Sequence, residues 1–246
     1  MIGTPSTQTA ICMNKETTRA LLIENGIKCP KGKTLWRNYE RDTSWKNELS
    51  DIEYPCVVKP TRSENSFGIS LVENSDEIEE AIERAFDHDE RILVDEFIQG
   101  REVRCSVIED ANSVNLIAFY PQEYHISPNS LRETNDKLQL DSSGRPLEQN
   151  SEVRTSYILR QNEPELHEAL EKVVKKAHKV LQCQDFSTYD IRVDADGQPW
   201  ILEVNLFSSF GSKSILVKHA IQSGWTPELL FRNMFWNQFK RYSNRH

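Results

Sequence analysis

The chain of 246 residues carries a formal charge of -8, has a pI near 5.4 and contains five cysteines. This acidic balance excludes an extended nucleic-acid surface, which needs an excess of Lys and Arg, and no apolar run approaches the roughly 20 residues that cross a bilayer. With no signal-peptide pattern and no close Cys-x-x-Cys pair, we expect a cytoplasmic protein with reduced cysteines that binds small molecules.

Local sequence signals predict helices and strands that alternate without internal repeats. Asn14 suits the N-cap of a first helix, with Gly26 beyond its end and the apolar run 20–23 facing the interior. Ser75 is expected to cap a second helix. The expected helices span 14–25, 76–86, 163–181 and 227–242; the expected strands span 55–60, 69–72, 91–98, 102–108 and 114–120; a hairpin is expected over 189–205. In the second helix, Ile78, Ala81, Ile82 and Ala85 form an apolar stripe that we assign to the core.

Two polar stretches are expected to be loops. The first, residues 61–70, is turn-rich, of hairpin length and suited to folding over a ligand. The second, residues 128–155, is rich in Asn, Asp, Ser and Gly. Loops of that length are usually functional lids or disordered, and both interpretations stay open.

The hairpin over 189–205 carries the clearest chemical signal. Asp196-Gly197 is a strong signal for a two-residue turn, in which Ala195 would face Gln198. Counting outward from that turn places Asp190 opposite Glu203, with Asn205 one pleat further on the same face. A loop one residue longer would send Glu203 to the other face.

Two carboxylates that face each other in a sheet repel unless a cation neutralises them. Two acids and an amide oxygen suit a hard divalent ion, so we predict a Mg²⁺ site at Asp190, Glu203 and Asn205. A solvated polar face is the alternative interpretation of this hairpin.

Four elements in a fixed order carry a family resemblance. They are Lys15, then Val57-Val58-Lys59-Pro60 with a serine-bearing loop after it, then Val94-Asp95-Glu96-Phe97-Ile98-Gln99-Gly100-Arg101-Glu102, and finally Asp190 with Leu202-Glu203-Val204-Asn205. From about residue 3 to 235 the chain resembles the ATP-grasp superfamily, and within it the D-alanine–D-alanine ligases. The resemblance implies an α+β ATP-grasp fold with an N-terminal lobe over 1–98, a C-terminal lobe over 99–246, and ATP bound between antiparallel sheets.

The resemblance also implies a role for each matching residue. Adenine would contact the hinge strand at Asp95, Glu96, Phe97 and Ile98, Leu202 would belong to the nucleotide-binding residues, and Glu102 would accept hydrogen bonds from ribose hydroxyls. The phosphates would meet Lys15, Lys59 and Lys137. The loop over 63–68, which includes Ser66, would close over the phosphates and exclude water.

The implied reaction is phosphorylation of a carboxylate by ATP to an acyl phosphate, which an amine then attacks to form an amide. Mg²⁺, for which Mn²⁺ could substitute, would bridge phosphate oxygens. The implied substrates are amino acids or small peptides, and the resemblance allows a homodimer.

Three departures from the ligases limit what the resemblance implies. Those ligases carry an arginine two residues before the metal aspartate, where this chain has Thr188; Arg192 could substitute as a catalytic cation or only pair with Asp194. Their Pro-Gly turn after the metal asparagine is replaced here by Leu206-Phe207, although Ser214 matches a serine that grips the second substrate. This chain also begins after their N-terminal domain, which puts D-alanine as the substrate in doubt.

These departures keep two alternatives to a carboxylate–amine ligase open. One is a non-catalytic or truncated nucleotide-binding paralogue. The other is a kinase or synthetase that uses a carboxylate other than an amino acid.

Overall fold

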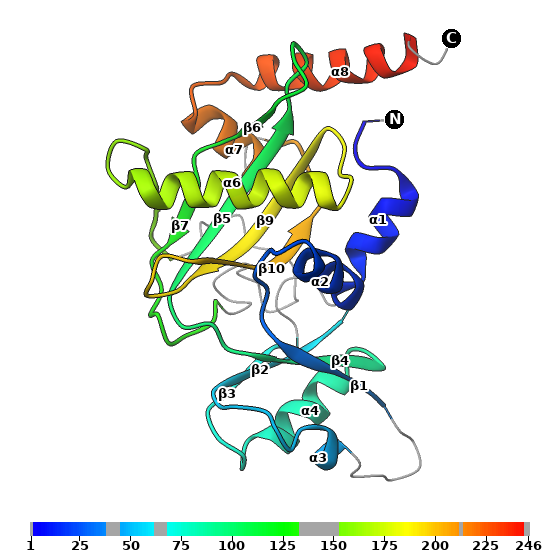
Figure 1. Ribbon diagram of the computed structural model, residues 1–246, viewed down its shortest axis with the longest axis vertical. Helices are drawn as coiled ribbons and strands as arrows, with labels where there is room; N and C mark the ends of the chain where they lie inside the picture. The colour runs from blue at the N-terminus through cyan, green and yellow to red at the C-terminus, as the bar shows by residue number, and fades with distance from the viewer. Residues whose placement is uncertain (1, 38–44, 62–67, 133–152, 212–213, 244–246) are drawn as a thin grey trace, which may run out of the picture. The chain divides into compact units, whose positions relative to one another are not determined.

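The computed structural model describes residues 2–37, 45–61, 68–132, 153–211 and 214–243 (Figure 1). Its contacts divide the chain into two compact units: the first unit comprises Met1–Cys29, Arg101–Tyr124 and Thr155–His246, and the second unit comprises Pro30–Gly100 and His125–Arg154. The predicted boundary after residue 98 lies two residues before Gly100, where one segment of the second unit ends. Residues 1–29, which were expected in the N-terminal lobe, group with the hairpin in the first unit. The division into two functional lobes stays a prediction.

The first unit is built on an antiparallel sheet whose described strands follow the order β10-β9-β5-β7-β8, with β6 also paired to β5. The strands are β5 (Arg101–Glu109), β6 (Leu116–Ala118), β7 (Gln122–Tyr124), β8 (Thr155–Tyr157), β9 (Phe186–Val193) and β10 (Pro199–Asn205). Its helices are α1 (Ser6–Met13), α2 (Lys15–Glu24), α6 (Pro164–Val180), α7 (Ile215–Gln222) and α8 (Pro227–Ser243).

Alternation along the strands gives this sheet one apolar face and a second face that carries polar side chains, together with Ile108 and Phe186, which pack against α7 and α8. The apolar face is covered by α6, which lies across β5 and β9 (Figure 1). Leu170, Val174 and Ala177 are fully buried against it, at the i, i+4, i+7 spacing of one helix face. The helix expected over 163–181 is therefore present as α6, and this side of it belongs to the core of the first unit.

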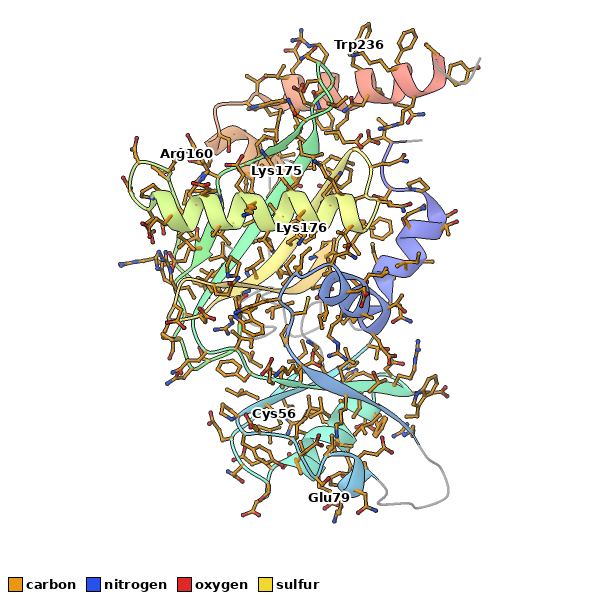
Figure 2. All side chains as sticks on the ribbon, viewed as in Figure 1. Cys56, Glu79, Arg160, Lys175, Lys176 and Trp236 are labelled. Carbon is orange, nitrogen blue, oxygen red and sulfur yellow. The ribbon has the colours of Figure 1, made fainter. Side chains whose placement is uncertain are left out.

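The second unit contains a four-stranded antiparallel sheet with the order β1-β4-β2-β3. Its strands are β1 (Gly32–Trp36), β2 (Cys56–Pro60), β3 (Ser70–Val72) and β4 (Arg91–Glu96), and its described helices are α3 (Trp45–Glu48) and α4 (Ile78–Phe86). The predicted stripe on α4 is buried against this sheet, as expected. Figure 2 shows Cys56 inside this unit and Glu79 on the outer side of α4.

Helix α2 begins as predicted, because Oδ1 of Asn14 accepts the Thr17 N–H at 3.0 Å, and Gly26 follows its end with φ of 67°. The expectation that the run 20–23 faces inward is wrong. Leu22 is 1% exposed but Ile23 is 48% exposed, because consecutive residues of a helix point in different directions. Ser75 does not cap α4, which starts three residues later at Ile78, after a turn in which the Asn74 side chain accepts the Asp76 N–H.

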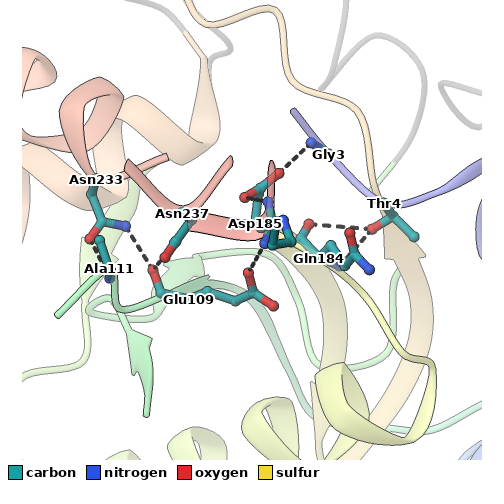
Figure 3. Close-up of polar contacts among 9 residues, drawn as sticks. Gly3, Thr4, Glu109, Ala111, Gln184, Asp185, Asn233 and Asn237 are labelled. Carbon is teal, nitrogen blue, oxygen red and sulfur yellow. Dashed lines mark hydrogen bonds and ion pairs between the residues drawn. The ribbon is translucent and has the colours of Figure 1, made fainter. Parts of the chain in front are cut away.

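Polar contacts fix α8 to one end of the first unit's sheet (Figure 3). Asn233 and Asn237 donate through Nδ2 to the main-chain oxygen of Glu109, at 2.7 and 3.0 Å. Asp185, which is fully buried, accepts the Gly3 N–H at 2.6 Å and also pairs with Arg241 of α8. One carboxylate thus connects the N-terminal segment to the C-terminal helix.

No helix in the described ranges is long and apolar enough to cross a membrane. All five cysteines are within the described residues, and all are buried without a disulfide.

Candidate active site

The hairpin of β9 and β10 forms, but the predicted two-residue turn is wrong. The Asp194 N–H donates to the Gln198 oxygen at 3.2 Å, which leaves residues 195–197 as a three-residue loop with Gly197 at φ 76°. Oδ1 of Asp194 accepts the N–H groups of Asp196 and Gln198, at 3.1 and 2.9 Å. The Asp194 side chain therefore stabilises the longer turn, and the Asp196-Gly197 signal alone does not report its participation.

A β-bulge restores the predicted pairing of the two acids. The longer loop alone would place Glu203 on the opposite face from Asp190. Ile201 pairs with Ile191, and the next pair is Glu203 with Asp190, so the extra residue is Leu202. The predicted opposition of Asp190 and Glu203 is confirmed, and the nucleotide-binding role expected of Leu202 falls on the bulged residue and stays a prediction.

Three rows of polar side chains cross this face of the first unit's sheet. The middle row pairs Gln122, Arg104, Asp190 and Glu203 on β7, β5, β9 and β10; one flanking row contains Glu102 and Arg192, and the other contains Ser106, Thr188 and Asn205. Residues paired across antiparallel strands point to the same face. The candidate metal residues therefore share one surface with two arginines.

Arg104 is the functional candidate that sequence reasoning missed. Its Nη2 donates to Oδ2 of Asp190 at 2.7 Å and its Nε donates to Oδ1, so both carboxylate oxygens are engaged. Asn205 also donates to Oδ2, at 3.2 Å. The alternation of Glu102, Arg104 and Ser106 along a predicted strand is the signal that could have placed Arg104 on this face.

Glu203 also has a basic neighbour, Lys15, the first residue of α2. Their Nζ and Oε1 atoms are 3.7 Å apart, and the Glu203 side chain is 39% exposed. Each of the two acids therefore lies beside a cation that the chain itself supplies, which offsets their mutual repulsion.

Arg192 lies opposite Glu102, with Nη2 3.6 Å from Oε2, and is only 2% exposed. Asp194, the alternative partner considered for Arg192, accepts the Trp200 indole N–H at 2.8 Å besides its turn contacts. The structure thus brings Arg192 to the proposed ribose-binding residue Glu102. Its catalytic role stays a prediction.

A buried hydrogen-bond network adjoins the middle row. Ser106 Oγ lies 2.9 Å from both Thr188 Oγ1 and His219 Nδ1, and His219 Nε2 lies 3.2 Å from Gln122 Oε1. Burial first, and then the charge of Arg104, lower the pKa of His219 to about 3. His219 is therefore neutral near pH 7, and Thr188 belongs to an uncharged network.

In the second unit, Lys59 forms a buried ion pair with Asp95. Nζ and Oδ2 are 2.7 Å apart, and the two side chains are 13% and 5% exposed. Gly32 lies opposite Asp95, and a Cβ there would be 2.1 Å from Oδ1 of Asp95. Only glycine leaves room for this carboxylate, which holds the Lys59 ammonium in place.

The predicted hinge strand ends earlier than expected, at Glu96. The Glu96 N–H donates to the Lys31 oxygen at 2.8 Å, and the Phe97 N–H donates to the Pro55 oxygen at 3.2 Å. Oε1 of Glu96 also accepts the Lys31 N–H at 2.8 Å. The adenine contacts expected of Asp95, Glu96, Phe97 and Ile98 stay predictions.

Two predicted nucleotide contacts, Ser66 and Lys137, lie outside the described residues. Ser214 precedes α7, is 8% exposed and has its Oγ 2.6 Å from that of Ser208. Its substrate-binding role stays a prediction.

The donor chemistry of the hairpin fits a hard divalent cation. Asp190 and Glu203 supply carboxylate oxygens, and Asn205 supplies an amide on the same face. Across the described ranges there is no group of three or more His, Cys, Asp or Glu side chains that could hold a metal ion. The candidate metal site consists of two acids and one amide.

Comparisons with known proteins identify a family. The model of the family described as D-ala D-ala ligase C-terminus matches residues 21–235. The D-alanine–D-alanine ligase of Clostridium beijerinckii is 28% identical over 212 residues, which are 86% of this chain and 63% of that protein. The vancomycin B-type resistance protein VanB of Enterococcus faecalis is 28% identical over 230 residues, which are 93% of this chain and 63% of that protein.

Solved structures of ligases have a similar fold. The VanG D-Ala:D-Ser ligase from Enterococcus faecalis has a TM-score of 0.75 and 25% identity, over 95% of this chain and 64% of that chain. The D-alanine–D-alanine ligase from Bacillus anthracis has a TM-score of 0.78 and 22% identity, over 100% and 73%. The chain spans less than two thirds of the length of the curated relatives described above.

Proposed function

Because this chain belongs to the D-alanine–D-alanine ligase C-terminal family and has the α+β ATP-grasp fold, we propose that it is an ATP- and Mg²⁺-dependent ligase that joins a carboxylate to an amine. The supporting observation is the bulge at Leu202, which brings Asp190 and Glu203 to one face of the sheet. A hairpin whose polar face is only solvated has no need of a bulge that restores the pairing of these two acids.

The residues have distinct roles in this proposal. Asp190, Glu203 and Asn205 would hold Mg²⁺, which when bound offsets charge on the phosphate oxygens. Lys59 and Lys15 would bind phosphates, and Glu102 would accept hydrogen bonds from the ribose. The substrate carboxylate would attack the γ-phosphorus of ATP and release ADP, and an amine would then displace phosphate from the acyl phosphate.

The substrates proposed are amino acids or small peptides. The relatives' names mention D-alanine and, for one structure, D-serine. We propose the same chemical class here without choosing a member, with the cytoplasm as the location and a homodimer as the assembly.

A non-catalytic nucleotide-binding protein is the second candidate. It is favoured by the contact of Arg104 with both oxygens of Asp190, which neutralises the candidate metal ligand without a metal. The two functions differ in turnover and agree in ATP binding.

The test is ADP release from ATP and Mg²⁺ across a panel of amino acids and dipeptides, with products identified by mass spectrometry. We expect ADP only when a carboxylate and an amine substrate are present, and none from Glu203→Gln. Glu123→Gln is the matched control, because Glu123 is on the other face of the same sheet and pairs with Arg101. ATP binding without turnover of any pair would favour the second candidate.

A further inference from the structure

The two carboxylates among the candidate metal ligands, Asp190 and Glu203, each lie beside a basic side chain of the first unit. Arg104, from β5, donates to both oxygens of Asp190, and Lys15, from α2, lies 3.7 Å from Glu203. The Arg104 and Asp190 side chains are 19% and 15% exposed, so water screens this pair weakly. The nucleotide-free site is thus close to neutral before any metal binds.

Charge balance opposes binding of a metal ion alone. A divalent cation added to Arg104, Asp190, Glu203 and Lys15 would bring the local charge to about +2, and the Coulomb cost is largest for weakly solvated groups. ATP phosphates remove that cost because they carry negative charge. Metal binding and nucleotide binding at this site are therefore expected to be coupled.

The hydrogen-bond capacity of Asp190 leads to the same result. A carboxylate oxygen has about two lone-pair sites, and Oδ2 already accepts from Arg104 Nη2 and from Asn205 Nδ2. A metal ion bound to Oδ2 must displace one of these donors. The displaced guanidinium would stay charged, and its planar fork of N–H groups matches phosphate as well as carboxylate.

We propose that Arg104 is a resident cation that exchanges partners. Without nucleotide it holds Asp190; with Mg²⁺ and ATP, Asp190 binds the metal and Arg104 donates to phosphate oxygens. This inference rests on the proposed function and adds a phosphate-binding residue to it. The guanidinium carbon of Arg104 lies over the Tyr124 ring, 5.9 Å from the ring centroid, which supports Arg104 beside the site.

The exchange predicts opposite effects of one substitution on two ligands. Calorimetry would measure binding of MgCl₂ alone and binding of ATP in saturating MgCl₂. In Arg104→Gln we expect about tenfold tighter Mg²⁺ binding, because a competing cation is gone. We expect about tenfold weaker ATP binding, because a charge-assisted contact is lost. A merely structural arginine would not change the two affinities in opposite directions, so affinities that are equal to wild type or both weakened overturn the proposal.

Two further variants complete the test. Arg101→Gln removes another β5 arginine, which pairs with Glu123 and Glu163 at 2.6 Å, and we expect both affinities to be unchanged. If Arg104→Gln does not fold by circular dichroism, Arg104→Lys replaces it. Lysine keeps the charge but loses the fork, so the same two signs at smaller size are expected, and unchanged affinities overturn the exchange. Wild-type protein that binds no ATP would instead remove the proposed function.

Discussion

Asp190 and Glu203 lie directly opposite each other because two local irregularities of the hairpin cancel. The three-residue loop shifts the register by one residue, and the bulge at Leu202 shifts it back. A one-residue slip exchanges the two faces of a strand. The candidate metal site therefore depends on the loop as well as on its own side chains.

The first prediction concerns the loop residue Gly197, which has φ 76° and no heavy atom within 4 Å of an added Cβ. A substitution at Gly197 therefore lowers stability only through the strain of the left-handed backbone, and not through a clash. We expect Gly197→Ala to lower the free energy of unfolding by about 1 kcal/mol, and Gly197→Asn to lower it less, since Asn tolerates the left-handed region. Urea denaturation checks both. Gly211→Ala, at a position with the same open space and no left-handed φ, should change stability by under about 0.5 kcal/mol.

The second prediction separates the two acids in metal-free protein. Asp190→Asn leaves the Arg104 guanidinium without its counter-charge in a mostly buried site, and should cost about 2–3 kcal/mol of unfolding free energy. Glu203→Gln should cost under about 0.5 kcal/mol, because Glu203 is 39% exposed and its Lys15 contact is long. Equal losses in urea denaturation without Mg²⁺ would contradict the different environments of the two acids.

The third prediction separates binding from stability at Lys59. Lys59→Met should weaken ATP binding roughly ten- to a hundredfold and lower unfolding free energy by about 2 kcal/mol, because Asp95 stays buried without its ammonium partner. The double variant Lys59→Met with Asp95→Asn should regain most of that stability and none of the affinity. Restored ATP binding in the double variant, measured by calorimetry, would exclude phosphate contact by Lys59.

The parts of the site that the sequence predicts are those with local signals. The hairpin follows from alternation and turn residues within one segment, and the strand that carries Lys59 follows from a short apolar run. The length of the turn was mispredicted because it depends on the Asp194 side chain, which accepts two main-chain N–H groups. The correct pairing resulted because the unforeseen bulge offset that error.

The missed features depend on partners distant in sequence. Arg104 contacts Asp190 only because β5 pairs with β9, and no local pattern specifies which strands become neighbours. The same holds for Asp95 beside Lys59, which requires β4 to lie next to β2. The strands β7 and β8 have three residues each, too few for a periodic pattern to identify.

The fourth prediction concerns the buried carboxylate of Asp185, which accepts the Gly3 N–H (Figure 3) and also pairs with Arg241. Asp185 has φ 61°, and Asn tolerates that conformation, so Asp185→Asn tests the charge and should cost about 2 kcal/mol. Asp185→Ala should cost about 1–2 kcal/mol more, from backbone strain and the lost acceptor for Gly3. Glu109→Gln is the control: Glu109 pairs with the same arginine but is 28% exposed, so its loss should be under about 1 kcal/mol.

The last prediction concerns the pH dependence of stability and the buried residue His178 on α6. Its Nδ1 lies 2.7 Å from Ser187 Oγ, which donates to the Tyr189 hydroxyl at 2.9 Å, so Nδ1–H is the donor to Ser187. Nε2 is then an unprotonated nitrogen, buried with no hydrogen-bond partner among the described residues. Protonation would place a charge there, and burial accordingly lowers the pKa of His178 to about 4.

Between pH 6.5, the ordinary pKa of histidine, and pH 4, the unfolded chain binds a proton at His178 that the folded chain does not. The free energy of unfolding should therefore fall as the pH drops through this window, by up to about 1.4 kcal/mol per pH unit from this one group, and level off below it.

His178→Gln keeps a side-chain amide that can donate to Ser187 and removes the titration. Urea denaturation from pH 7.5 to 4 should show a shallower decline in the variant, by about 2 kcal/mol at pH 5 after correction for the difference at pH 7.5. The buried His219 titrates in both proteins, so it cancels in this comparison, and parallel curves would mean that His178 is protonated in the folded state.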